Sequence, residues 1–417
     1  MIATQSGQRG VSLIELMIAL TIGTLLVLGL VQVFSASRTA YQLSTGLARA
    51  QENGRFAMDM LQRDLRVAGH MGCVNDQARF LPENITPSRP ALVSTFLTAA
   101  DQFNSNFEAV DSYALRLDRM VEGFDAKDTA SGQTLALPAV PTAAIDGGSW
   151  TPALPAAIHG ELTSPVAGSD VLVLRHFAPA GAQVTSFTAG APATIQFDIS
   201  HLPRLTEGVT SPHLLGISDC MTAAVFEAGG TLSSGTITVA TGGVSKRSLT
   251  DQPFVTGQAM LYRAESLVYY VGINQQGTPS LYRARFGLDG AGALTSINEE
   301  LVEGIESLQL QYGLDSEIGA AARPTGNIGR SHVASASIFP AGTAEANANV
   351  WRRVGIVQVG LVARSAERAA AVQRNTAGDA GVAPLSIVGV RMTPPNDGFY
   401  RTVYEDSVAL RNRLFGN

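Results

Sequence analysis

A single uninterrupted apolar run near the N-terminus constrains this chain more than any other feature. Residues 11–34 read VSLIELMIALTIGTLLVLGLVQVF and follow a short polar leader, MIATQSGQRG. As an α-helix such a run would extend about 36 Å, which is enough to cross a hydrocarbon core of about 30 Å. We therefore predict a membrane-spanning helix at the start of the chain.

One acidic residue, Glu15, helps to decide whether this apolar run is a signal peptide, a plain membrane anchor or something else. A secretory signal peptide has an apolar core of about 7–15 residues, shorter than the run here, although the small residues Ser35, Ala36 and Ser37 do follow it. A plain membrane anchor explains the length but leaves Glu15 unexplained, because a carboxylate at a helix centre costs about 2.5–3.5 kcal/mol in a bilayer. Intramembrane acids usually have a partner, so Glu15 is a candidate functional residue.

The residues around Glu15 resemble a known processing signal. Residues 10–16, GVSLIEL, are similar to the cleavage motif of type IV prepilins and of type II secretion pseudopilins, with Val11 where Phe is most usual. The resemblance implies that a prepilin peptidase cuts between Gly10 and Val11, that the new amine of Val11 is N-methylated, and that Glu15 is the family's retained acid. A neighbouring subunit's ammonium could pair with Glu15 in the core of a fibre, offsetting the cost of burying both charges.

The helical pattern continues beyond the apolar run. Small and apolar residues recur every three or four positions from 43 to 68, with charged residues between them, and Gly69 is a typical helix end. We predict one helix of about 55 residues, in which 11–34 is the transmembrane or fibre-core half and 35–69 is amphipathic. Packing on a sheet is favoured over a coiled-coil stalk, because several heptad core positions lack Leu or Ile.

The amphipathic half narrows the resemblance to one branch of the family. Residues 51–57, QENGRFA, and 61–69, LQRDLRVAG, followed by Gly72 and Cys73, resemble the PilW minor pilins of type IV pili, as do Cys220 with its neighbours and the segment 408–413. The resemblance implies a structural subunit, not an enzyme, with no catalytic residue, cofactor or metal. It also implies several partners: other minor pilins, the major pilin, the prepilin peptidase, the inner-membrane assembly platform and, as a further candidate, a tip adhesin.

The two cysteines, Cys73 and Cys220, allow either one disulfide or two buried thiols. Export of the body would favour the disulfide. The chain-entropy model credits a link across so long a loop with roughly 5 kcal/mol at most.

The rest of the chain predicts a β-rich body. Only 15% of residues are charged, against about 25% in typical soluble domains. Strand patterns occur at 171–177, 308–312, 354–362 and 403–414, and a hairpin at 267–286; the stretch 354–362, apolar on both faces, is typical of a central strand. Tracts rich in Pro and Gly at 127–168, 178–195 and 319–349 predict loops.

These elements predict a pilin-like α+β fold, with a long N-terminal helix packed on an antiparallel β-sheet and an enlarged second β-rich part. The leader is 1–10, and 70–417 forms the periplasmic body, as one or two subdomains. The chain would cross the inner membrane once and later enter a pilus fibre at the cell surface.

Little in the body points to chemistry. The six histidines are scattered without metal-ligand spacing, and a net charge of -6 without a dense basic patch argues against direct nucleic-acid binding. A minor pilin in pilus assembly or initiation, at or near the fibre tip, is the leading interpretation. A minor pseudopilin of type II secretion is an alternative. A membrane-tethered periplasmic enzyme or receptor is another, and it predicts an uncut N-terminus and a concave site with converging titratable groups.

Overall fold

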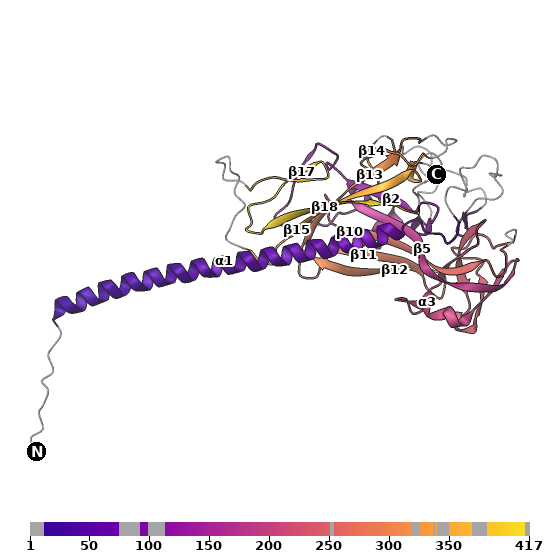
Figure 1. Cartoon of the computed structure of the whole chain (residues 1–417), viewed down its shortest axis with the longest axis horizontal. Coiled ribbons are helices and arrows are strands. Elements are labelled where there is room, and N and C mark those ends of the chain that lie inside the picture. The colour runs from indigo at the N-terminus through magenta and orange to yellow at the C-terminus, as the bar shows by residue number, and fades with distance from the viewer. Residues whose placement is uncertain are drawn as a thin grey trace, which may run out of the picture.

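The computed structural model describes residues 12–74, 92–98, 113–250, 254–318, 325–336, 338–339, 350–368 and 382–412. A single long helix, α1, projects from a body built of β-sheets, and its N-terminal half extends away from that body (Figure 1). The predicted α+β architecture, with a long helix and an enlarged β part, is therefore confirmed. The leader 1–10 and Val11 lie outside the described residues.

Helix α1 runs from Leu13 to Val67 without interruption over 55 residues, the length that the sequence predicts. It ends just before Gly69, whose positive φ of 81° is a conformation that glycine adopts without strain. The amide of Asn412 donates to the carbonyls of Val67 and Ala68, at 3.2 and 3.3 Å. The last turn thus has partners for carbonyls that a helix leaves unpaired.

An antiparallel four-stranded sheet lies against the C-terminal half of α1. Its order is β14 (Ile328–His332), β13 (Ile305–Asp315), β15 (Val354–Arg364) and β18 (Arg401–Ala409). The central place of β15 confirms the prediction from its two apolar faces. Ala57, Leu61 and Leu65 of the helix join the core of this sheet, so helix-on-sheet packing is confirmed. Strand β18 ends at Ala409, earlier than the predicted 403–414.

A larger sheet lies beside it. The predicted hairpin is present as β10 (Met260–Ile273) and β11 (Pro279–Leu288), and β12 (Leu294–Glu303) extends it to the edge. On the other side β10 pairs with β5 (Val171–Thr188), which pairs in turn with β2 (Val121–Ala126). The short β4 (Trp150–Thr151) follows β2.

The far parts of β5 and β10 belong to a closed ring of six strands. The ring runs β10, β7 (Leu214–Ser218), β8 (Ala223–Gly229), β9 (Thr236–Val239), β6 (Thr194–Phe197) and β5, which pairs with β10 again. Side chains such as Val184, Ile195 and Phe226 fill it as a separate core. Strand β1 (Leu92–Ser94) adds to β8, and α3 (Leu202–Thr206) packs beside β5 and β10. This ring is the second β-rich part of the body.

The ring corrects one prediction: residues 178–195 are not a loop, because β5 continues to Thr188. Pro179 lies where the pairing of β5 with β10 shifts register, between the pairs Phe177–Ala264 and Gly181–Tyr262. A proline is tolerated at such a bulge because no ladder hydrogen bond from its nitrogen is needed there.

A small third sheet of β16 (Leu385–Ile387), β17 (Val390–Thr393) and β3 (Thr134–Ala136) covers one face of β15 and β18. Most of 127–168 is irregular as predicted, with only β3, β4, one 3-10 turn (Gly147–Ser149) and α2 (Ala156–His159) inside it. The tract 319–349 contains β14, and the rest of it lies largely outside the described residues.

Candidate assembly interface on the N-terminal helix

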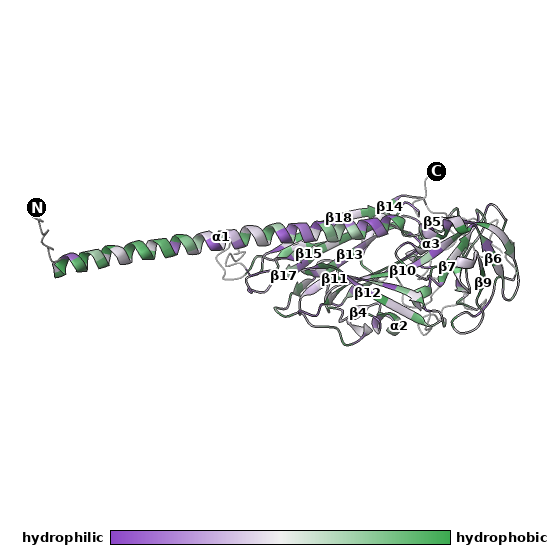
Figure 2. Ribbon diagram, turned by 90° about the horizontal axis from the view of Figure 1, so that it is seen from below, coloured by the Kyte–Doolittle hydropathy of each residue, from purple (hydrophilic) through white to green (hydrophobic). Residues whose placement is uncertain are grey.

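The N-terminal half of α1 presents apolar side chains that the body does not cover. From Leu13 to Phe34, the large apolar residues are each more than half exposed, as Leu13 (77%) and Phe34 (70%) illustrate. Figure 2 shows this half coloured hydrophobic along its length, whereas hydrophilic residues gather on the half beside the sheets. The helix is long and apolar enough to cross a membrane, and a surface of this kind requires lipid or protein against it.

Glu15 lies in the first turn of α1 and closes a capping box with Ser12. The Ser12 backbone N–H donates to Oε2 of Glu15 at 3.0 Å, and the Glu15 N–H donates to the Ser12 hydroxyl at 3.2 Å. Two backbone donors that a helix start leaves unpaired are satisfied in this way. No described residue bonds to Oε1 of Glu15, so that oxygen can accept from a group on another chain.

The C-terminal half of α1 is fixed to the body through a stripe of small and apolar residues. Its buried residues are Gly46, Ala50, Gly54, Ala57, Met58, Leu61 and Leu65. Polar contacts fix the register along this stripe: the Asn53 amide donates to the carbonyl of Glu303 at 3.0 Å, and the Tyr404 hydroxyl donates to the carbonyl of Gln51 at 3.1 Å. These bonds join the helix to β12 and β18, so its direction relative to the body is set on two sides.

A half-buried charge cluster holds the same helix to β10 and β11. The Tyr269 hydroxyl donates to the Asp64 carboxylate at 2.5 Å, and Arg283 forms an ion pair with the same oxygen at 3.1 Å. Burial, and then the charge of Asp64, raises the pKa of Tyr269 far above its ordinary value. Tyr269 therefore stays a neutral donor at any physiological pH.

A disulfide anchors the end of the helix to the ring. Cys73 follows α1, Cys220 lies between β7 and β8, and the two are joined with their Cα atoms 4.7 Å apart. Of the two alternatives left open by the sequence, the structure contains the disulfide. The link crosses 147 residues of chain, and it holds the second β-rich part against the end of α1.

Two buried carboxylates fasten the larger sheet to its neighbours. Asp170 accepts from the backbone N–H groups of Ala126 and Leu310, at 2.9 and 2.8 Å, which joins β2 to β13. Asp125 accepts from the N–H groups of Ala334 and Ser335 at 3.1 and 2.9 Å. Burial, and then the negative charge of Asp125, raises the pKa of Asp170 well above its ordinary value.

The structure places the predicted site residues unevenly. Glu15 and the two cysteines lie among the described residues, whereas the cleavage position between Gly10 and Val11 does not. Sequence reasoning missed Ser12 as the partner of Glu15, although the spacing Ser-x-x-Glu before an apolar run is the signal for a capping box. Within the described residues, no group of three His, Cys, Asp or Glu side chains could hold a metal ion.

Two family comparisons match the ends of this chain. The model of the type IV pilus-assembly protein W family, PilW, matches residues 268–412, which include β12, β15 and β18 beside α1. The model of the prokaryotic N-terminal methylation motif matches residues 5–31, which include Gly10, Val11 and Glu15. No curated protein and no solved structure matches the chain. The two matches together are consistent with a PilW-type pilin, and the ring strands β5 to β9 lie outside both of them.

Proposed function

We propose that this PilW-type chain is a minor pilin that enters a type IV pilus through α1 and helps to start its assembly. The observation that carries the proposal is the bare apolar half of α1, which begins at a capped acid within a methylation motif. In the membrane, lipid covers this half. In the fibre, the apolar helices of other minor pilins and of the major pilin would cover it instead, so extraction exchanges one apolar environment for another.

Processing supplies the charge that Glu15 needs. Cleavage by the prepilin peptidase after Gly10 would leave Val11 with a free ammonium group, N-methylated by resemblance. Oε2 of Glu15 is already used by Ser12, while Oε1 has no bond among the described residues. A neighbouring subunit's ammonium at Oε1 would neutralise a carboxylate that is otherwise expensive in an apolar core.

The shape of the body supports a place at or near the fibre tip. The ring of strands lies at the end of the body opposite the bare half of α1, as Figures 1 and 2 both show. A subunit in the shaft of the fibre has neighbouring subunits both above and below it. A subunit at the tip has none above it, so the end of its body that carries the ring is not covered. The ring could then meet a tip adhesin, while the inner-membrane platform acts on the opposite end.

The PilW match favours a type IV pilus over a type II secretion machine as the place of action. The alternative of a membrane-tethered enzyme or receptor predicts a chain that keeps its leader. Mass spectrometry of the N-terminus, with and without the prepilin peptidase, separates these outcomes. We expect a methylated Val11 as the first residue, and an intact Met1 or a cut near Ala36 would refute the pilin assignment.

Variants of Glu15 and Ser12 test the role of the charge. Glu15→Gln keeps a side chain that suits a capping box and removes the charge, so it should be cleaved normally but recovered several-fold less in sheared fibres. Ser12→Ala is the matched control: it removes the cap, at about 1 kcal/mol, and leaves the carboxylate, so its incorporation should stay near that of the wild type. Wild-type incorporation of Glu15→Gln would eliminate charge pairing from the mechanism.

A further inference from the structure

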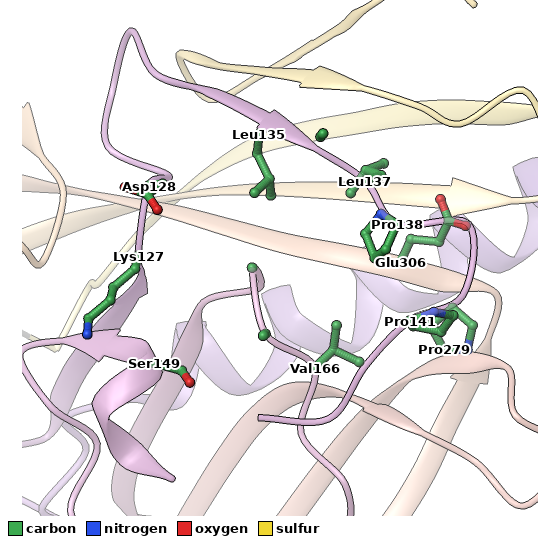
Figure 3. Close-up of a pocket in the computed structure, with 13 residues that line it drawn as sticks. Lys127, Asp128, Leu135, Leu137, Pro138, Pro141, Ser149, Val166, Pro279 and Glu306 are labelled. Carbon is green, nitrogen blue, oxygen red and sulfur yellow. The ribbon is translucent and has the colours of Figure 1, made fainter. Parts of the chain in front are cut away.

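A cavity of about 300 Å³ opens between the small third sheet and the two larger sheets (Figure 3). Its wall is largely apolar and includes Leu135, Leu137, Pro138, Pro141, Val166 and Pro279. Lys127 and Asp128, both exposed, also border it. An apolar interior with a few charged groups at its rim is the composition of a protein-binding pocket.

Backbone hydrogen bonds hold this pocket open in its present shape. The Leu137 N–H donates to the carbonyl of Thr393 at 2.9 Å, and the Val166 N–H donates to that of Val271 at 2.8 Å. Gly168 has a φ of 86°, and a Cβ built on it would lie 3.2 Å from Leu135. The wall is thus preformed, so little ordering would have to accompany binding.

The segment that forms one wall also carries exposed apolar side chains. Val140 is 74% exposed and Ile145 is 95% exposed. They flank Ala143, which bridges to Val166 of the pocket wall. Single exposed apolar residues are ordinary, but two of them on the segment that forms one wall of an apolar pocket enlarge the exposed apolar surface there, and such surfaces bind other proteins.

The pocket lies at the level where α1 first touches the body. Glu306 of its wall pairs with Arg364 at 3.3 Å. The next residue, Ser365, lies beside Gly46, the first buried residue of the helix, where an added Cβ would be 3.2 Å from the Cβ of Ser365. In Figures 1 and 2, β17, which pairs with β3 of the pocket wall, lies at the end of the body from which the bare half of α1 emerges.

We infer that this pocket receives an apolar side chain from the body of the neighbouring pilin subunit beneath this one in the fibre. The inference rests on the proposed function, because helices bundled along the bare half of α1 place the next body against this end of the molecule. The pocket and the bare helix then form one continuous interface. The exposed Lys127 and Asp128 at the rim give the partner a polar border to match.

A crosslinking experiment tests the contact in cells that assemble the fibre. Ala167 lines the pocket and is exposed, so a photoreactive phenylalanine analogue at this position would reach the occupant. Ala291, exposed in the turn between β11 and β12, is the matched control. Glu303, at the end of β12, is three residues before the pocket residue Glu306. Ala291 lies beyond the other end of β12, about 30 Å away along the strand. We expect the Ala167 probe to give an adduct that contains a pilin, and the Ala291 probe to give none.

Filling the pocket provides a second measurement. Ala167→Trp should lower the amount of this chain in sheared fibres several-fold, while Ala291→Trp should not, and both should unfold at the wild-type temperature. Should Ala167→Trp unfold early, Ala136→Trp in the same wall replaces it.

The outcomes distinguish this inference from the proposed function. Normal incorporation of the filled variant, or an adduct with a protein other than a pilin, would overturn the inference and leave the Glu15 mechanism intact. Adducts are read in membrane and fibre fractions alike. If the chain never enters fibres but still gives a pilin adduct, the proposed role in the fibre would be overturned, whereas the inferred contact between the pocket and a pilin would stand.

Discussion

Replacing Gly54 tests how firmly the body holds α1. A Cβ at Gly54 would lie 2.1 Å from Cε2 and 2.4 Å from Cδ2 of the Tyr404 ring, whereas carbon atoms in contact are about 3.5–4.0 Å apart. In the Gly54→Ala variant, either the Tyr404 ring or the helix must therefore move away from its present position. A ring that swings away also loses the hydrogen bond from its hydroxyl to Gln51.

The expected loss follows from three contributions. Overpacking costs about 1–3 kcal/mol, and the lost hydrogen bond costs about 1 kcal/mol. Alanine in place of glycine in a helix interior returns about 1 kcal/mol. We therefore expect Gly54→Ala to lower the free energy of unfolding by about 1–3 kcal/mol. Urea unfolding of the full chain in detergent, followed by the fluorescence of Trp351 in the core under the helix, measures it.

Two other glycines of the same helix supply controls. At Gly29 a new Cβ would meet nothing within 4 Å, so Gly29→Ala should not destabilise the body. At Gly46 the new Cβ would lie 3.2 Å from Cβ of Ser365, so a small loss is expected. Combining Gly54→Ala with Tyr404→Ala removes the clash, and the pair should lose less than the sum of the two single changes. Additive losses, or a Gly54→Ala variant as stable as the wild type, would refute the close approach.

Two further predictions concern the body. The Cys73→Ser/Cys220→Ser variant should lose about 2–5 kcal/mol in the same urea assay, because the link spans 147 residues; equal unfolding midpoints for oxidised and reduced wild type would contradict this. Asp170 has a raised pKa in the fold, so it keeps its proton at pH values where the unfolded chain has released it. The stability that Asp170 contributes should therefore decrease as the pH rises above about 4 and through its folded pKa. Asp170→Asn should flatten that dependence, even though it loses an acceptor for one N–H, and unchanged slopes would rule Asp170 out as the source.

The helix could be predicted almost completely from the sequence, because local patterns determine it. The apolar run, the three-to-four spacing from 43 to 68 and Gly69 together predict a helix that the structure places at Leu13–Val67. The central position of β15 could be predicted for the same reason, since a strand buried on both faces is apolar on both.

The ring could not be predicted in this way. Strands β6, β7 and β9 are four or five residues long, too short for a periodic pattern to stand out. Their places depend on partner strands: β7 pairs with β10, which is distant in sequence, and β9 pairs with β6 and β8. Pro179 and Gly181 suggested a loop because their role, a shift in register against β10, depends on the partner strand. The buried pair Asp125 and Asp170 was invisible for a similar reason: each accepts N–H groups from other elements.

The stretch between the two halves of α1 bears on how the proposed interfaces act together. The apolar run ends at Phe34 and the body first covers the helix at Gly46. The residues between them, SASRTAYQLST, would hold the body about 16 Å beyond the end of the apolar run as a helix. The helix contains no proline, the usual cause of a sharp kink. The proposed pairing at Glu15 and the proposed contact at the pocket are thus joined by one continuous helix. If Glu15 sets the axial position of α1 in the fibre, the same position would decide whether the pocket meets the neighbouring subunit.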